Sequence, residues 1–195
     1  PKTVRQLFSM ATVLIPLAEG CEELEAVSLI DLLRRADITV ITASLTDNTL
    51  VTASRGVRLM ADTTLENVIY DDFDMIILPG GMPGTSHLDE DVHVQAIIKR
   101  LYQSDKAVAA LCAAPLVLAN MGLLNGKNVS CYPGVLHAAD WPEIKLCDDS
   151  VVIDGNILTS RGPGTAMDFA LAIIEYLINQ ATRNSVEAGL VRPTK

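Results

Sequence analysis

The chain has 195 residues, of which 49% are hydrophobic and 20% are charged, and its formal net charge at pH 7 is −9. This length and composition are typical of one globular domain and exclude an intrinsically disordered chain. The acidic balance argues against nucleic acid or an anionic membrane as the main partner, because both are bound by basic surfaces.

Cysteine usage and the chain ends give further expectations. The cysteines, Cys21, Cys112, Cys131 and Cys147, lack the close pairs of a zinc site and the density of a disulfide scaffold. We therefore expect a reduced, cytoplasmic protein, and no apolar run reaches the roughly 18 residues of a membrane span. Residues 1–9 show no periodicity and are interpreted as an added tail or linker, which leaves a domain at 10–195.

Short apolar runs alternate with amphipathic segments along the chain. Buried strands are predicted at 11–17, 38–44, 74–81, 107–111, 128–133, 150–155 and 156–162. Helices are predicted at 21–37, 91–105, 113–122 and 164–181, the last with Thr165 as its N-cap, and a two-stranded excursion at 49–62 turns near Ser54–Gly56. This alternation predicts an α/β fold with a mainly parallel sheet covered by helices on both faces. Ligands of such sheets bind at the carboxyl ends of the strands.

Cys112 lies where the strand at 107–111 meets the following helix, in the stretch VAALCAAPLVLANMG. The N-terminus of that helix is expected to lower the pKa of the Cys112 thiol, and the backbone N–H of Ala113 could donate to an oxyanion. Pro115 suits the first helical turn, where a missing N–H costs nothing. The alternative is a buried cysteine that acts as a small hydrophobic residue.

Two glycines end the strand at 74–81. In LPGGMPGT they allow backbone N–H groups to point into a pocket, and Gly81 is the candidate for a second oxyanion donor. An ordinary turn is the alternative. The spacing of phosphate-binding glycine loops is absent.

Glu25 heads an apolar stripe on the helix at 21–37. Leu29, Leu32 and Ala36 follow it at helical spacing, so its carboxyl group is expected to be buried. A buried carboxyl group is protonated or partnered, and opposite a thiol it could transfer a proton. The alternative is an acid that favours the helix dipole, which suits Glu22 and Glu23.

In combination, these motifs resemble the ThiJ/PfpI superfamily. The segments that carry the resemblance are GCEELEAVSLIDLLRRADITV, SRGV, DMIILPGGMPG, VAALCAAP and LTSRGPGTAMDFAL, within about 11–180. The branch that contains the parkinsonism-associated protein deglycase and YajL is the most similar. The resemblance implies a flavodoxin-like three-layer sandwich and a homodimer.

The resemblance also assigns site residues. It marks Cys112 as the nucleophile, Glu25 as its carboxylate partner, and Gly81 and Ala113 as the backbone donors to an oxyanion. The positions that border the site or support the dimer are Arg55, Arg161, Gly162 and Pro163.

The histidines set this chain apart from other members. Tyr132 stands where relatives have a histidine before a proline, and Ala113 stands where PfpI-type relatives have one, so a peptidase triad is poorly supported. His87 and His93 are expected in or beside an exposed helix, and His137 on the surface. Isolated histidines of this kind do not predict a metal site.

The function that the resemblance implies is a glyoxalase III or deglycase activity without a cofactor. The substrates of this activity would be small reactive aldehydes such as methylglyoxal, or their adducts. The role of the protein would be protection against carbonyl and oxidative stress. The alternative is a redox-sensing chaperone in which oxidation of Cys112 is the functional event. A cysteine peptidase is the weakest of the three hypotheses.

Overall fold

A computed structural model describes residues 11–194 of the chain. Its centre is a seven-stranded sheet with the order β10-β11-β7-β6-β1-β2-β5. In chain order the strands are β1 (Thr12–Leu17), β2 (Thr39–Ser44), β5 (Thr63–Thr64), β6 (Met75–Leu78), β7 (Ala107–Leu111), β10 (Val151–Asp154) and β11 (Ile157–Ser160). Neighbouring strands are parallel except β10, which pairs antiparallel with β11 at one edge. The predicted, mainly parallel sheet is confirmed.

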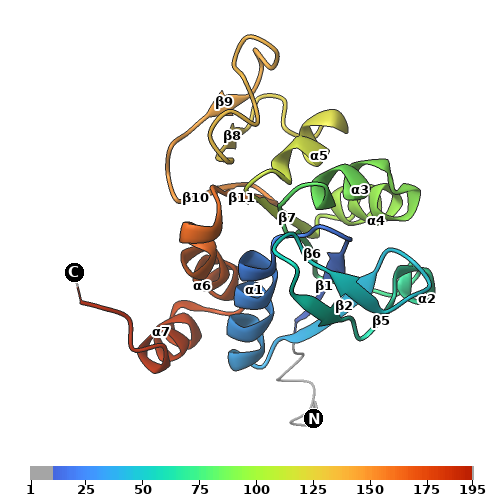
Figure 1. Ribbon diagram of the computed structural model, residues 1–195. Coiled ribbons are helices and arrows are strands. Elements are labelled where there is room, and N and C mark those ends of the chain that lie inside the picture. Colours follow the sequence, from blue (N-terminus) through green and yellow to red (C-terminus); the bar gives the residue numbers. More distant parts are fainter. Residues whose placement is uncertain (1–10, 195) are drawn as a thin grey trace, which may run out of the picture.

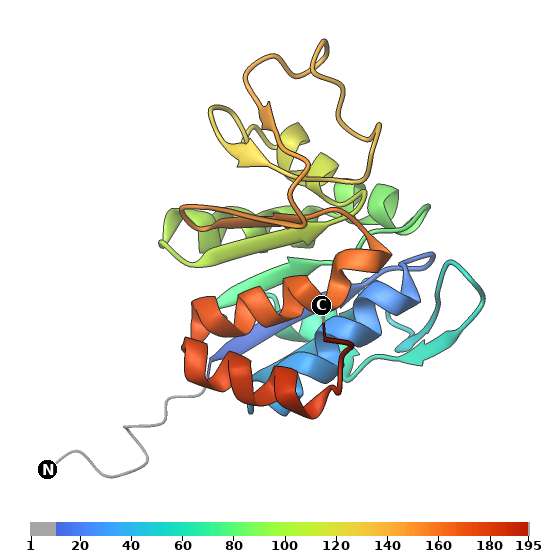
Figure 2. The same ribbon diagram turned by 90° about the vertical axis from the view of Figure 1, so that its left-hand side faces the viewer.

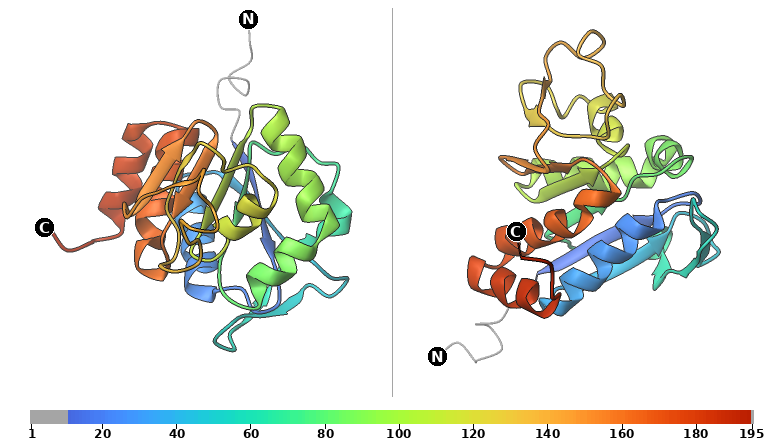
Figure 3. Two further views of the ribbon diagram at one scale, coloured as in Figure 1. Left: turned by 90° about the horizontal axis from the view of Figure 1, so that it is seen from above. Right: turned by 60° about the vertical axis from the view of Figure 1, so that its left-hand side comes forward.

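Helices cover both faces of this sheet, as Figures 1 and 3 show. One face carries α1 (Glu23–Arg35) and α6 (Ala166–Leu177), and α7 (Gln180–Gly189) packs against α6. These three helices form one layer in Figure 2. The other face carries α2 (Leu65–Val68), α3 (Gly84–Glu90), α4 (Val92–Gln103) and α5 (Pro115–Asn120). The molecule is therefore the three-layer, flavodoxin-like sandwich that we expected.

Each face of the sheet has its own apolar core. In β1, Val13, Ile15 and Leu17 belong to the core beneath α1 and α6, whereas Leu14 belongs to the core on the other face. Successive side chains of a strand point to opposite faces, and here both faces are covered by helices. For this reason the central strands are apolar at consecutive positions instead of alternating.

Two smaller pairs of strands lie outside the main sheet. β3 (Leu50–Thr52) and β4 (Arg58–Met60) form an antiparallel hairpin, which confirms the predicted excursion at 49–62. β8 (Asn128–Val129) and β9 (Lys145–Leu146) pair in parallel within a segment that protrudes beyond the layers in Figure 2.

Two predicted elements differ from the structure. The strand expected at 128–133 is only two residues long, because the backbone N–H of Tyr132 donates to Cys112 instead of continuing a ladder. The helix expected at 164–181 ends at Leu177, and α7 begins after Asn179, whose side chain caps it by accepting from the N–H of Thr182.

The start of α6 also departs from the prediction, because the predicted N-cap residue makes different hydrogen bonds. Thr165 is the N-cap residue, but its side chain makes no capping hydrogen bond to the helix. Its hydroxyl oxygen instead accepts from the N–H of Gly162 at 3.1 Å and pairs with the hydroxyl of Ser160 at 2.7 Å.

The short helices α2 and α3 were not predicted from the sequence.

Residues 1–9, interpreted above as a tail, lie outside the described residues. Within 11–194, none of the helices combines the length and the apolar character needed to cross a membrane.

Candidate active site

The site lies at the carboxyl ends of four neighbouring strands. The segments that follow β1, β6, β7 and β11 meet there, joined by the turn of the β3–β4 hairpin. They enclose a cavity of about 390 Å³. Its lining consists of Glu22, Ser54, Arg55, Gly81, Met82, Cys112, Ala113, Tyr132, Val135 and Pro163. The cavity therefore occupies the edge at which parallel sheets bind ligands.

Cys112 forms a sharp turn between β7 and α5. Its φ of +62° lies in the left-handed region, which is uncommon for a residue with a side chain and is often found at functional sites. Two hydrogen bonds hold this conformation: the Cys112 N–H donates to the carbonyl of Ser160 at 3.1 Å, and the Cys112 carbonyl accepts from the N–H of Tyr132 at 2.8 Å. Pro115 occupies the first turn of α5, as expected.

Glu25 is completely buried on the first turn of α1. Leu29, Leu32 and Ala36 are buried on the same face of that helix, so the predicted stripe is confirmed. Oε1 of Glu25 accepts from the N–H of Gly80 at 2.9 Å. Oε2 has no hydrogen-bond partner of regular geometry, but the Cys112 thiol is close enough to affect the pKa of the carboxyl group through a hydrogen bond.

Gly80 separates the thiol from the carboxyl group. A Cβ atom at this position would lie 2.6 Å from Cβ of Cys112 and 2.9 Å from Oε1 of Glu25. Both distances are too short for a real Cβ atom, so only glycine allows the two side chains to lie this close together. The role of Gly80 was not predicted from the sequence, although the Gly80–Gly81 pair indicated that backbone N–H groups point into a pocket.

Burial sets the protonation of Glu25 and Cys112, the Cys112–Glu25 pair. It raises the pKa of Glu25 to about 7, and burial together with the negative charge of Glu25 raises the pKa of Cys112 to about 12. The expected lowering of the Cys112 pKa is therefore wrong in direction. α5 is a helix of only six residues, and the loss of hydration outweighs its dipole. The pair holds at least one proton near neutral pH, and a thiolate requires that proton to be on Glu25.

The backbone N–H groups of Gly81 and Ala113 lie close enough to the sulfur of Cys112 to affect its pKa. Their hydrogen bonds oppose the rise in its pKa, because they favour the thiolate. An oxyanion formed on a carbon bound to this sulfur would lie beside the same two donors. The structure thus brings together Cys112, Glu25, Gly81 and Ala113, the four residues predicted for this purpose.

Glu22 and Glu23 have separate structural roles. The carboxylate of Glu22 accepts from the N–H of Glu25 at 2.8 Å and so caps α1, at the helix end where an acid was expected to favour the dipole. Glu23 is buried, and its contacts with the hairpin were not predicted. Its carboxylate accepts from the hydroxyl of Ser54 and the N–H of Arg55, both at 2.9 Å, and from the N–H of Val57 at 3.2 Å.

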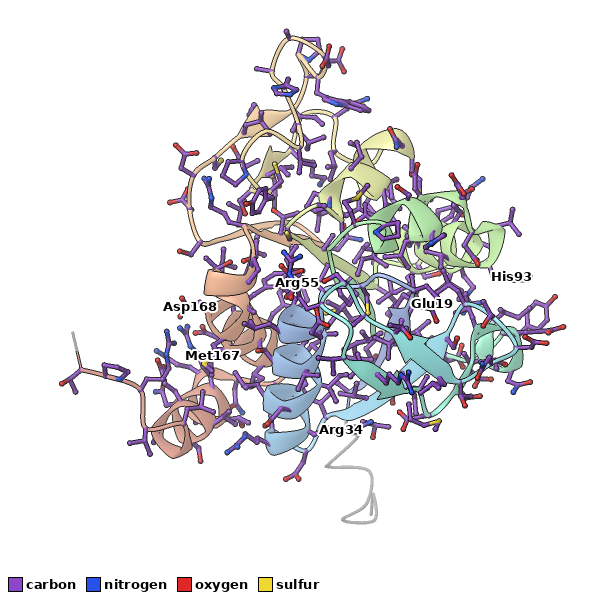
Figure 4. The ribbon with its side chains drawn as sticks, viewed as in Figure 1. Glu19, Arg34, Arg55, His93, Met167 and Asp168 are labelled. Atoms are coloured by element: carbon purple, nitrogen blue, oxygen red, sulfur yellow. The ribbon has the colours of Figure 1, made fainter. Side chains whose placement is uncertain are left out.

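The hydrogen bonds of the Glu23 carboxylate attach the β3–β4 hairpin to α1. Burial opposes ionisation of Glu23, but the hydrogen bonds from its own backbone, Ser54 and the hairpin amides lower its pKa, so it is a carboxylate at neutral pH. Figure 4 shows the result: Arg55 lies at the N-terminal end of α1, whereas Arg34 lies at the opposite end.

The remaining predicted residues divide into two groups. Tyr132, Arg55 and Pro163 line the cavity, as expected of residues that border the site. Arg161 does not line it, and its guanidinium pairs with Asp148 at 2.8 Å.

The histidines lie apart from the cavity. His87, His93 and His137 are exposed, and Figure 4 shows His93 far from Arg55. Among residues 11–194, no group of three or more metal-ligating side chains could hold a metal ion.

Comparison with known proteins places this arrangement in a family. A "Protein DJ-1 homolog B" of Arabidopsis thaliana is 41% identical over 169 residues, which are 84% of this chain but 37% of the relative; the chain thus spans little more than a third of that protein. A "Glutathione-independent glyoxalase DJR-1.2" of Caenorhabditis elegans is 36% identical over 176 residues, 90% of this chain and 92% of the relative.

Solved structures agree with the sequence relatives. The crystal structure of Drosophila melanogaster DJ-1beta is 38% identical and superimposes with a TM-score of 0.89, covering 95% of this chain and 100% of the other. The model of the DJ-1/PfpI family matches residues 11–176, which include the cavity and each residue of the Cys112–Glu25 pair. The chain therefore belongs to the DJ-1/PfpI family.

Proposed function

We propose that this protein converts small α-oxoaldehydes such as methylglyoxal into 2-hydroxy acids, without a cofactor and with Cys112 as the nucleophile. One observation carries the proposal: a buried carboxyl group with a pKa of about 7 and two backbone donors converge on a single thiol. A carboxyl group with a pKa near the working pH can both accept and donate a proton. The name of the Caenorhabditis elegans relative describes a glyoxalase, which agrees with this chemistry.

The first step forms a hemithioacetal. The Glu25 carboxylate takes the thiol proton of Cys112, and the resulting thiolate attacks the aldehyde carbon, so that a C–S bond forms and the C=O π bond breaks. The N–H groups of Gly81 and Ala113 stabilise the resulting oxyanion, which then takes the proton from Glu25.

The second step moves hydrogen between the two carbons. The Glu25 carboxylate removes the hydrogen of the former aldehyde carbon as a proton, which gives an enediol, and returns it to the neighbouring carbon. The hydroxyl proton of the first carbon passes to the second oxygen, and a thioester of Cys112 remains. The first carbon is oxidised and the second reduced, so no external oxidant is required.

Water completes the reaction. It attacks the thioester carbon, the C–S bond breaks, and the pair regains its proton. In sum, one α-oxoaldehyde and one water give one 2-hydroxy acid, which is lactate when the substrate is methylglyoxal. Arg55 and Tyr132, which line the cavity, are exposed to solvent, so water can reach the site.

Steady-state conversion of methylglyoxal tests the proposal, with a chelator present and glutathione absent. The wild type and Cys147→Ala, a control on a remote loop, should both produce lactate. Cys112→Ala should produce none, and Glu25→Gln should lose about 10²- to 10⁴-fold in rate while still forming a hemithioacetal that mass spectrometry detects. Full activity of Cys112→Ala would disprove the proposed nucleophile.

Deglycation is expected to be indirect. Hemithioacetals and early amine adducts of methylglyoxal dissociate reversibly, so an enzyme that consumes the free aldehyde removes them without binding them. Adduct loss should therefore reach a ceiling, the spontaneous dissociation rate, as the enzyme concentration rises. A rate that keeps increasing beyond that ceiling would indicate a direct deglycase.

Redox sensing is the second candidate function. The observation that favours it is the same pair of N–H donors, which could bind the oxygens of an oxidised Cys112. A protective role against carbonyl and oxidative stress is compatible with either function. A peptidase is disfavoured, because no histidine is among the residues that line the cavity.

We expect the protein to form a homodimer in the cytoplasm, with no membrane or nucleic-acid partner. Leu24 and Val27 on α1 and Val57 on the hairpin are about half exposed and offer an apolar surface for a second copy. The four cysteines are all free thiols, which suits a reducing compartment.

A further inference from the structure

The lining of the cavity that contains Cys112 includes several large apolar side chains. They are those of Met82, Tyr132, Val135 and Pro163, and those of Met82 and Tyr132 are 59% and 50% exposed. Large apolar side chains that remain exposed around a reactive group are typical of a surface that binds a ligand.

Tyr132 is held at its backbone, and its ring lies beside one neighbouring residue. Its backbone N–H donates to the carbonyl of Cys112 at 2.8 Å, so the residue is attached directly to the proposed nucleophile. A Cβ atom added to Gly162 would lie 3.4 Å from Cδ2 and 3.8 Å from Cε2 of the ring. One edge of the ring therefore faces Gly162, next to Pro163, and Tyr132 gives the cavity an aromatic lining.

The cavity is larger than methylglyoxal requires. Its volume of about 390 Å³ lies in the range of about 300 to 1,000 Å³ that is typical of pockets for larger ligands. Its charged lining residues are Glu22 and Arg55, one of each sign, and the Glu22 carboxylate already accepts from the N–H of Glu25. The space beside Tyr132 therefore favours an uncharged, apolar substituent.

We infer that the site accepts α-oxoaldehydes whose ketone carbon carries an aryl group, and that Tyr132 is the specificity-determining residue that contacts this group. The inference rests on the proposed function. The bonds that form and break at the two carbonyl carbons are those given above, and the aryl group takes no part in them. Stacked or edge-to-face contact with the Tyr132 ring strengthens binding beyond the effect of buried area alone.

Phenylglyoxal, methylglyoxal and cyclohexylglyoxal are the probes. For each, kcat/KM is measured with the wild type, Tyr132→Ala, Tyr132→Phe and Tyr70→Ala, a control at a tyrosine that is 87% exposed and does not line the cavity. The wild type should prefer phenylglyoxal to methylglyoxal by about tenfold, and to cyclohexylglyoxal by a smaller factor. Tyr132→Ala should lose about tenfold more on phenylglyoxal than on methylglyoxal, whereas Tyr132→Phe and Tyr70→Ala should keep the wild-type preference.

Three results would overturn the inference. Equal losses on both substrates in Tyr132→Ala would mean that the residue only supports the turn at Cys112. A comparable loss in Tyr132→Phe would assign the effect to the hydroxyl group. A preference for cyclohexylglyoxal over phenylglyoxal would mean that the lining selects for apolar bulk and not for an aromatic ring.

A binding measurement separates this inference from the proposed function. Mandelate and lactate, the corresponding products, are titrated into wild type and Tyr132→Ala and followed by NMR. Tighter binding of mandelate that is lost in Tyr132→Ala supports the aryl site even if the wild type turns over none of the aldehydes, a result that would refute the proposed reaction alone. Equal binding of mandelate and lactate by the wild type would overturn the aryl site.

Discussion

The backbone N–H of Gly80 donates to Oε1 of Glu25 at 2.9 Å, across 55 positions of the sequence. This bond places a carboxyl group from α1 beside the loop that follows β6, next to the thiol that follows β7. Oε2 of Glu25 has no hydrogen-bond partner among the described residues, and the Cys112 thiol is close enough to affect the pKa of the carboxyl group.

Substitution of Gly80 should therefore lower the activity strongly. In Gly80→Ala the new Cβ would lie 2.6 Å from Cβ of Cys112, so the thiol and the carboxyl group must move apart. We expect kcat/KM for methylglyoxal to fall by about 100-fold, the loss typical of a displacement of about 1 Å in a catalytic site. Gly189→Ala is the control, because a Cβ there meets no atom within 4 Å. Equal activity of both variants would contradict the tight packing at Gly80.

Glu25 should make the stability of the fold depend on pH. Its pKa is raised from 4.5 in the unfolded chain to about 7, so the folded state binds the proton more tightly. The contribution to stability is complete below about pH 4.5 and is lost as the pH rises toward 7, by roughly 3 kcal/mol at ~1.4 kcal/mol per pH unit. Urea unfolding across this range should show the decrease in wild type and a much smaller one in Glu25→Gln. Parallel pH profiles of the two proteins would exclude Glu25 as the cause.

Oxidation of Cys112 by peroxide should stop largely at the sulfinic acid. Sulfinate oxygens can accept hydrogen bonds from the N–H groups of Gly81 and Ala113 and from protonated Glu25. Peptide mass mapping should show this product in the wild type and a shift toward the sulfonic acid in Glu25→Ala. The same product distribution in both proteins would rule out stabilisation by the carboxyl group.

Glu23 should hold the hairpin against local opening. Its carboxylate accepts from the N–H groups of Arg55 and Val57, and Glu23→Gln weakens both charge-assisted bonds. Hydrogen exchange of these two amides should accelerate by about tenfold or more, since such bonds are worth ~1.5–3 kcal/mol. The amide of Ala61, which donates to the Thr49 carbonyl at the other end of the hairpin, serves as the internal reference. Unchanged exchange at Arg55 and Val57 would show that other contacts hold the turn.

The proposed dimer depends on the exposed face of α1. Val27 is 45% exposed there, and Val27→Glu should place a charge in the interface, whereas Val92→Glu on α4, at a residue that is 69% exposed, should have no effect. Light scattering at micromolar concentration should give twice the chain mass of 20.9 kDa for the wild type and Val92→Glu, and the single mass for Val27→Glu. A wild type that measures as a monomer would refute the dimer.

The sequence by itself determined the elements that depend on local pattern. Apolar runs that alternate with amphipathic segments specify a sheet covered on both faces, because each strand must bury side chains on each side. The strand before Cys112 and Pro115 after it specify the strand-to-helix turn, and the stripe below Glu25 specifies a buried carboxyl group. These features come from neighbours within one or two turns of the chain.

Only the tertiary structure decided the features that depend on which segments meet. The thiol pKa rises because burial removes water from Cys112 and because the negative charge of Glu25 lies near it, effects that the short helix after Cys112 cannot offset. Glu23 holds the hairpin because Arg55, 32 positions away, donates its backbone N–H to the Glu23 carboxylate. Arg161 pairs with Asp148 and does not line the cavity. Burial and hydrogen bonding between distant segments set these energies, and no local pattern in the sequence encodes those contacts.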